Sequence, residues 1–200
     1  MQFGLIVQMT GILGYAQPLV RLAREAEAAG WDGFFIWDVF GGDAQVPTPM
    51  VDPWIALAAI ATATERIRLG PMVTPLPRRR PWKLAREAAS LDHLSGGRLI
   101  LGVGIGDAPS EFSRFGEEAD ALTLEELHDM RAFIQQHRTT DAPFDVMVGG
   151  DVPIDDPVMA REILTAYAGA GVTWWIEGIG EWRGDVDAMA AFIQGGPPGR

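Results

Sequence analysis

Carboxylates follow two of the apolar segments in this 200-residue sequence and could carry out acid–base chemistry. Asp38 comes directly after the segment GFFIW, and Asp107 comes directly after the glycine-rich stretch GVGIG. A carboxyl group beside an apolar neighbour such as Trp37 can transfer a proton, because desolvation favours its neutral form. The alternative for both residues is a turn or helix-capping role, in which the carboxylate accepts backbone hydrogen bonds.

Composition and motif spacing exclude several other chemistries. The sequence contains no cysteine, which rules out thiolate nucleophiles and thiolate metal sites. The three histidines, His93, His128 and His137, fall within expected helices, so neither a histidine metal site nor a catalytic triad is expected. The stretch GVGIGD follows the fourth expected strand instead of the first, and it predicts a tight strand exit, not a dinucleotide fingerprint.

Charge is distributed unevenly along the chain. The formal net charge is −11, and residues 101–200 carry the whole imbalance. Nucleic acid is therefore not an expected partner, because phosphate neutralisation requires a basic face. The cluster Arg78-Arg79-Arg80 is the exception, and it is either a solvated loop or a site for an anionic ligand.

Neither a targeting segment nor a membrane span is expected. The start of the chain, MQFGLIVQMTG, has no basic residue before its apolar stretch, and no apolar run approaches the length of a transmembrane helix. We therefore expect a cytoplasmic protein that acts on a small molecule.

Apolar strand-like segments alternate with helix-like segments along the chain. Strands are expected at 3–7, 33–37, 67–73, 99–103, 144–148 and 172–176, and helices at 18–29, from 53, and at 81–94, 123–137, 156–169 and 186–193. Asp52 and Pro53 are expected as the N-cap and first residue of the second helix. This alternation predicts an α/β protein with a parallel sheet, whose ligands lie at the carboxyl ends of the strands. The length favours a doubly wound open sheet, because a (β/α)8 barrel typically needs about 250 residues.

Three stretches resemble the luciferase-like monooxygenase family. They are LAREAEAAGWDGFFIWD, VTPLPRRRPWKLAREAASLDHLSGGR and YAGAGVTWWIEGI, and the resemblance extends over residues 2–110 and 143–195. It implies a TIM-barrel-like (β/α)8 fold instead of an open sheet, with reduced FMN or coenzyme F420 bound at the carboxyl ends of the strands. Residues 109–120 stand where the family has two further strand and helix units. We therefore expect a single domain over 1–200 that lacks about two internal units, with four units in 1–108 and two in 121–195.

The resemblance also implies site residues. Asp38 matches an acidic position after the second strand that F420-using members often follow with histidine, whereas this sequence has Val39. Asp107 falls where many F420 enzymes carry a proton-donating glutamate, and 72–74 matches a segment with a bulge or non-prolyl cis peptide behind the cofactor ring. The expected catalytic residues are Asp38 and Asp107, and the expected cofactor-binding residues are Trp37, Met72, Val73, Thr74, Arg78, Arg79, Arg80, Gly104 and Gly106.

The leading functional hypothesis is an FMN- or F420-dependent oxidoreductase of the monooxygenase type. The alternative is a shortened paralogue that binds flavin weakly or not at all and serves as an interaction subunit. A carboxylate-based hydrolase is a third hypothesis. A barrel wall without two units would leave two unpaired parallel edges, so we also expect a homo-oligomer, in the simplest case a dimer joined across those edges, or a rearranged barrel.

Overall fold

The computed structural model describes residues 1–39, 48–104, 147–149, 156–169 and 173–198. The expected helix at 123–137, the short segment at 109–120, and the predicted site residues Gly106 and Asp107 lie outside these residues.

A parallel sheet forms the centre of the described structure. Its five strands are β1 (Gln2–Val7), β2 (Gly33–Ile36), β3 (Arg68–Pro71), β6 (Met147–Gly149) and β7 (Trp174–Ile179). They are arranged in the order β3-β2-β1-β7-β6, so that the first strand of the chain lies beside its last strand. Adjacent first and last strands are the arrangement that closes a barrel.

The fourth expected strand lies beside β3 and extends the sheet on that side, forming with it the wall of a partial barrel. Leu69 pairs with Leu99 in parallel, and β4 (Thr74–Pro75) pairs in parallel with β5 (Val103–Gly104). The two backbones approach closely at Gly70, where a Cβ atom would lie 1.8 Å from the carbonyl oxygen of Ile100. Glycine therefore permits strand four to pair at this position.

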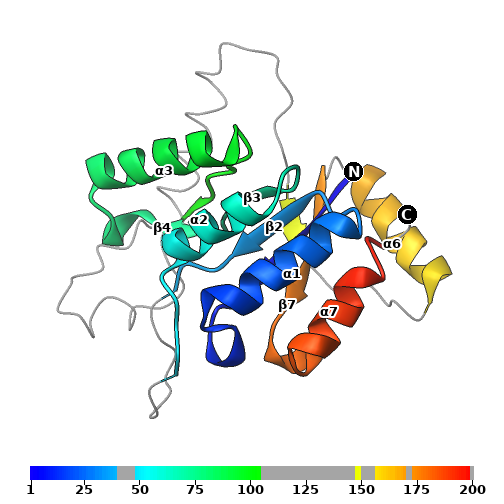
Figure 1. Cartoon of the computed structure of the whole chain (residues 1–200). Helices are drawn as coiled ribbons and strands as arrows, with labels where there is room; N and C mark the ends of the chain where they lie inside the picture. Colours follow the sequence, from blue (N-terminus) through cyan, green and yellow to red (C-terminus); the bar gives the residue numbers. More distant parts are fainter. Residues whose placement is uncertain (40–47, 105–146, 150–155, 170–172, 199–200) are drawn as a thin grey trace.

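The helices cover one face of the sheet. They are α1 (Ala16–Ala28), α2 (Pro53–Ala63), α3 (Pro81–Ser95), α6 (Pro157–Gly169) and α7 (Val186–Gln194). In Figure 1, α1 and α7 lie in front of the strands, and α1 packs against both α2 and α7 while α3 packs against α2. As predicted, the Asp52 side chain caps α2 by accepting from the backbone N–H of Ile55, and Pro53 begins the helix. Gly96 ends α3 in the left-handed conformation.

Two apolar clusters show whether helices cover one face of the sheet or both faces. The larger cluster joins the outward side chains of the strands to the helices, and includes Leu5, Phe34, Leu22 and Leu57. The smaller cluster, Phe35, Trp174 and Ile176, lies on the opposite face and contains no helical residue among those described. A doubly wound sheet has helices on both faces, so the expectation from chain length was wrong, and the structure is a singly wound, partial barrel wall.

Candidate functional site at the carboxyl ends of the strands

Two aromatic side chains cover one end of the inner face of the sheet, which is the face opposite the helices. Phe35 packs edge-on against Trp174, with ring centroids 5.9 Å apart. Gly4 and Gly33 make room for Phe35, because a Cβ atom at either position would come within 3 Å of its ring. Trp174 stands at the first position of β7, so this aromatic floor lies toward the amino ends of the strands.

Toward the carboxyl ends, the described residues cover the inner face less completely. Ile6 and Met72 pack against the aromatic cluster but remain half-buried. Gly178 brings no side chain to this face, and a Cβ atom there would meet only Trp182 among the described residues, at 3.3 Å. A half-buried apolar surface can receive a planar ring.

Asp38 follows β2 at this end and is held by three side chains. Its carboxylate accepts a hydrogen bond from the Thr74 hydroxyl and another from Nη2 of Arg79 at 2.5 Å, and it pairs with Nη2 of Arg78 at 3.5 Å. Arg78 also donates to the Asp38 carbonyl oxygen at 2.5 Å. Asp38 is 1% exposed, so this cluster ties the end of β2 to β4 and its following loop in a nearly dry environment.

The arginine cluster is therefore not a uniformly solvated loop. The side chains of Arg78 and Arg79 are only 4% and 16% exposed, because both reach back to Asp38. Arg80 is exposed, and no ion pair to it occurs within the described part of the chain. The solvated-loop alternative therefore does not hold for Arg78 and Arg79, whereas Arg80 is exposed and open to an anionic ligand.

The remaining predicted residues lie around the same end of the wall. Trp37 is half-buried directly after β2, and Gly104 ends β5, where a Cβ atom would come 2.5 Å from the Val73 side chain. The peptide bond between Met72 and Val73 is cis, so of the two features expected in this segment, a bulge or a non-prolyl cis peptide, the structure has the second. Thr74 is fully buried at its hydrogen bond to Asp38.

The strand expected at 172–176 would place Glu177 at the strand ends beside Asp38, and this placement is wrong. Strand β7 extends to Ile179, so Glu177 lies within it and points to the helix-covered face with Trp175. Its carboxylate accepts from the Trp175 indole at 2.7 Å and pairs with Arg183 at 3.4 Å. The two-residue alternation along the strand was the signal that could have placed it correctly.

One residue that sequence reasoning missed joins the loops after the first and last strands. Glu181 follows β7, and its carboxylate accepts from the backbone N–H of Ile12 at 2.9 Å. A Cβ atom at Gly11, which has φ +61°, would lie 1.8 Å from a Glu181 oxygen. This contact bridges 169 residues of sequence, which is why no local pattern indicated it.

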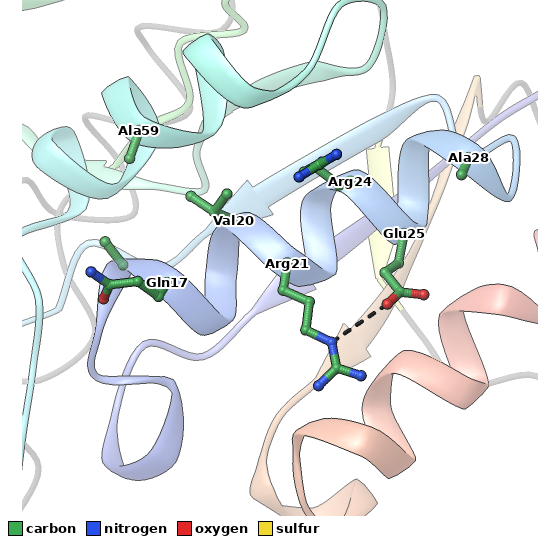
Figure 2. A pocket seen from close by; sticks show the side chains of 8 residues that line it. Gln17, Val20, Arg21, Arg24, Glu25, Ala28 and Ala59 are labelled. Atoms are coloured by element: carbon green, nitrogen blue, oxygen red, sulfur yellow. Dashed lines mark hydrogen bonds and ion pairs between the residues drawn. The ribbon is translucent and has the colours of Figure 1, made fainter.

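A groove of about 620 Å³ on the outer side of α1 is separate from this end of the wall. Its lining includes Gln17, Val20, Arg21 and Glu25, and Figure 2 shows the ion pair between the last two across the helix surface. These residues lie opposite the buried face of α1, so the helix itself stands between the groove and the sheet. No group of three or more His, Asp or Glu side chains placed to bind a metal occurs within the described residues.

The sequence pattern of the luciferase-like monooxygenase family matches residues 1–145. The chain belongs to this family. Over 98 residues it is 43% identical to a proposed coenzyme F420-dependent oxidoreductase of Mycobacterium tuberculosis, a match that covers 46% of this chain and 26% of that protein. Over 102 residues it is 38% identical to 4-hydroxyprotoasukamycin monooxygenase of Streptomyces nodosus, covering 50% and 28%. The matches thus span little more than a quarter of these relatives.

Solved structures of luciferase-like enzymes share the fold. The coenzyme F420-dependent tetrahydromethanopterin reductase of Methanopyrus kandleri superimposes with a TM-score of 0.53 at 20% identity, covering 98% of this chain and 62% of that one. The FMN-bound oxygenating component of a Pseudomonas putida 3,6-diketocamphane monooxygenase gives a TM-score of 0.52 at 21% identity, covering all of this chain and 65% of that one. The fold is therefore a shortened luciferase-like barrel.

Each of the described helices is too short or too polar to span a membrane.

Proposed function

We propose that this chain is a luciferase-like oxidoreductase that binds FMN or coenzyme F420 at the carboxyl ends of its strands and acts on a small molecule. The observation that supports this most is the inner face of the wall. An aromatic floor of Phe35 and Trp174 closes one end, and half-buried Ile6 and Met72 leave an apolar surface at the other. A flat, largely apolar ring fits such a surface.

The residues present also suit the phosphate-bearing side of either cofactor. Arg80 is exposed and immediately precedes α3, so a guanidinium group lies at the positive end of a helix dipole. This combination attracts phosphate oxygens. When bound, the reduced cofactor would supply the hydride or the oxygen activation, and the protein would supply binding and orientation.

Asp38 has a positioning role in this proposal. Both oxygens of its carboxylate already receive donors from Thr74, Arg78 and Arg79, so little acceptor capacity remains for a proton from a substrate. The catalytic role expected for Asp38 is tested by Asp38→Asn, which keeps the size of the side chain and removes its charge. A positioning role predicts weaker cofactor binding together with lower stability, whereas a catalytic role predicts lost turnover with binding and melting temperature retained.

Cofactor titration tests the proposed function directly. The purified protein would be titrated separately with FMN, coenzyme F420 and riboflavin, which lacks the phosphate, while the fluorescence of each is followed. We expect saturable binding of FMN or F420, and weaker binding to Arg80→Ser for the phosphate-bearing ligand only. Arg161→Ser, an exposed arginine on α6, is the matched control. Absence of saturable binding by both cofactors would contradict the proposal.

The alternative function is that of an interaction subunit that does not bind flavin. This alternative is favoured because the chain covers only part of its relatives' length, namely 62% and 65% of the two structural neighbours. The same titration separates the two functions, because the interaction subunit predicts no saturable binding of FMN or F420.

A further inference from the structure

A tryptophan side chain lies on the inner face of the sheet just beyond the end of β7. The inward-facing residues of this strand include Trp174 and Ile176, so the two-residue alternation makes Gly178 the next inward position. Gly180 follows in extended backbone, with φ −169°, and continues the alternation. A Cβ atom would lie 3.3 Å from the Trp182 ring at Gly178 and 2.0 Å from it at Gly180. The indole therefore covers the backbone of both glycines at the carboxyl end of the sheet.

The two neighbours of Trp182 in the chain hold it in place. The Glu181 carboxylate accepts from a backbone N–H of the loop after β1 at 2.9 Å. Arg183 donates through Nε to the carbonyl oxygen of Gly178 at 2.6 Å, and its guanidinium lies 3.8 Å from the ring centroid of Phe192 on α7. Trp182 therefore projects from a backbone that is fixed on both sides, and a ligand that binds to a fixed side chain loses less conformational entropy.

Although its backbone is fixed, the indole of Trp182 remains exposed. Trp182 is 59% exposed, whereas Trp174 and Trp175 on the preceding strand are only 1% and 2% exposed. Ile12, whose backbone N–H binds Glu181, is a second large apolar residue exposed in these loops, at 42%. An indole that rests on glycine backbone and is otherwise exposed offers a rigid surface on which a flat ring can stack.

Gln8 is the neighbour of this indole on strand β1. Ile6 pairs with Gly178 in the register of β1 and β7, and the backbone N–H of Gln8 donates to the carbonyl oxygen of Ile179, so the pairing continues past β1. Ile6 faces inward, and Gln8, two residues later, is half-buried at the next inward position. A side-chain amide offers both a hydrogen-bond donor and an acceptor without a charge.

We infer that Trp182 and Gln8 form a binding site for a neutral, planar aromatic ring that carries a hydroxyl or carbonyl group. Trp182 supplies the stacking surface, and the amide of Gln8 supplies a hydrogen-bond partner for the polar group at the edge of the ring. The charged side chains beside Trp182 are engaged in the fold, because Glu181 binds the loop after β1 and Arg183 pairs with Glu177. The site therefore suits a neutral ligand better than a charged one.

The occupant of this site is a substrate, an assignment that rests on the proposed function. In that function the cofactor ring packs on Ile6 and Met72. Trp182 covers the two glycines that are level with Ile6 and with Gln8, so the site extends beyond Ile6 toward the carboxyl ends of the strands. A molecule held there lies farther from the aromatic floor than the cofactor does, on the side from which a substrate approaches. The substrate class is therefore a neutral aromatic alcohol or ketone.

Binding of naphthol tests the inference, with decalol, its fully saturated and non-planar counterpart, as the control ligand. Both compounds would be titrated into the protein by calorimetry, with and without FMN or F420. We expect wild type to bind naphthol more tightly than decalol. Trp182→Leu keeps an apolar side chain but removes the ring, so it should raise the naphthol Kd about 5–10-fold, and Trp182→Phe should restore most of the affinity. Trp82→Leu, at a tryptophan on α3 that is 66% exposed, is the matched control and should leave the Kd unchanged.

Gly180→Ala gives a second variant that leaves Trp182 in the chain. The added Cβ atom would displace the indole, which lies 2.0 Å away, while any residue can adopt the backbone φ of −169°. We expect this variant to lose naphthol affinity to the same extent as Trp182→Leu, to retain the wild-type melting temperature, and to have no further effect when combined with Trp182→Leu. Gly169→Ala, where the added atom meets nothing within 4 Å, is the control.

The outcomes separate this inference from the proposed function. Wild-type protein that does not discriminate between naphthol and decalol, or a Trp182→Leu protein that binds naphthol as tightly as wild type, overturns the inference. Equal weakening of cofactor and naphthol binding by Trp182→Leu also overturns it, because the indole would then belong to the cofactor site. Absence of cofactor binding overturns the proposed function instead, and naphthol binding that depends on Trp182 would still support the aromatic site.

Discussion

Single side chains hold the carboxyl ends of the strands in place. Asp38, Thr74, Arg78 and Arg79 form one buried cluster between the end of β2 and the loop after β4. In a nearly dry site, a carboxylate and a guanidinium depend on one another, because removal of either leaves an uncompensated charge. Stability and site geometry are therefore coupled at this cluster.

Replacing Arg78 should be costly, whereas replacing Arg80 should not. We expect Arg78→Met to lower the free energy of unfolding by about 3 kcal/mol, because it breaks a buried ion pair and leaves the Asp38 carbonyl oxygen without this donor. Arg80→Ser, on an exposed side chain of the same loop, should change it by less than about 0.5 kcal/mol. Urea unfolding of the two variants beside wild type provides the comparison. Equal stability losses would show that the Asp38 cluster does not hold the loop.

Glu27 should make the stability depend on pH. Burial opposes ionisation of this carboxyl group, but hydrogen bonds from the backbone N–H groups of Ile67, Arg66 and Glu65 outweigh it and lower the pKa of Glu27. The donor–acceptor distances to its Oε2 atom are 2.8, 2.6 and 3.0 Å. A lowered folded-state pKa contributes stability that is fully present above the unfolded pKa, near 4.5, and that is lost as the pH falls through the folded value.

The variant Glu27→Gln tests this contribution. At pH 7 it should lower the free energy of unfolding by about 1 kcal/mol, because an amide oxygen accepts the same hydrogen bonds without charge. The difference from wild type should shrink in unfolding experiments below pH 4. Glu162→Gln, an exposed carboxylate on α6 that has no ion pair within the described residues, is the control. A stability difference that stays constant between pH 7 and pH 3.5 would contradict a stabilising role for the ionised Glu27 carboxylate.

At the scale of elements, Arg98 joins two helices to the edge of the wall. Its guanidinium donates to the carbonyl oxygens of Ala61 and Thr64 at the end of α2, of Ser95 at the end of α3, and of Ile67 before β3, at 2.6–3.0 Å. A planar group with five donors can satisfy several helix-terminal carbonyls at once. Helices α2 and α3 are thereby held at a defined separation.

Lysine cannot replace this arginine. Arg98→Lys should lower the free energy of unfolding by about 2–3 kcal/mol, because a single ammonium group cannot reach carbonyls on three elements and leaves some of them without a donor. The exposed Arg68→Lys serves as the control and should be nearly neutral. Thermal and urea unfolding measure the stability of both variants. An Arg98→Lys protein as stable as wild type would mean that water satisfies these carbonyls equally well.

A side chain at Gly70 should separate two strands. The Cβ atom of Gly70→Ala would lie 1.8 Å from the backbone oxygen of Ile100, which cannot move without breaking strand pairing. We expect a stability loss of about 3 kcal/mol or more. Gly169→Ala, at the end of α6, has nothing within 4 Å of the added atom and is the matched control. Circular dichroism and urea unfolding report both, and an unchanged Gly70→Ala protein would contradict the close pairing of strand four with β3.

At the scale of the whole molecule, the wall has the winding of a barrel but belongs to a chain shorter than its relatives. The sheet begins with strand four and ends with β6, and its inner face is lined by apolar side chains. A ligand held against this face contacts strands from both ends of the chain, so its binding should stabilise the fold as a unit.

Thermal unfolding with cofactor should reveal that coupling. At a cofactor concentration 100 times its dissociation constant, stability should rise by about 2.7 kcal/mol, which corresponds to roughly 5–10 °C in a domain of this size. We expect this shift with FMN or F420, and a smaller one for Arg80→Ser at the same concentration. Scanning calorimetry measures it. A melting temperature that neither cofactor changes would support the interaction-subunit alternative.

The sequence by itself determined the local elements, because they depend on neighbouring residues. Apolar segments alternating with helix-like segments placed the strands and helices that the structure describes, and Asp52 and Pro53 marked the start of α2. The residues near GWDGFF and VTPLPRRRP indicated the family, and the resemblance implied a bulge or a cis peptide within 72–74, where the structure has a cis bond between Met72 and Val73.

Only the tertiary structure decided the winding of the sheet and the partners of the charged groups. An apolar strand covered on both faces has the same pattern in a doubly wound sheet and in a barrel wall, so periodicity could not choose between them. Asp38 meets Arg78 and Arg79 across 40 and 41 residues, and Glu181 meets Ile12 across 169. Such contacts depend on which strands become neighbours, and strand order is a property of the assembled sheet, which no local stretch of residues contains.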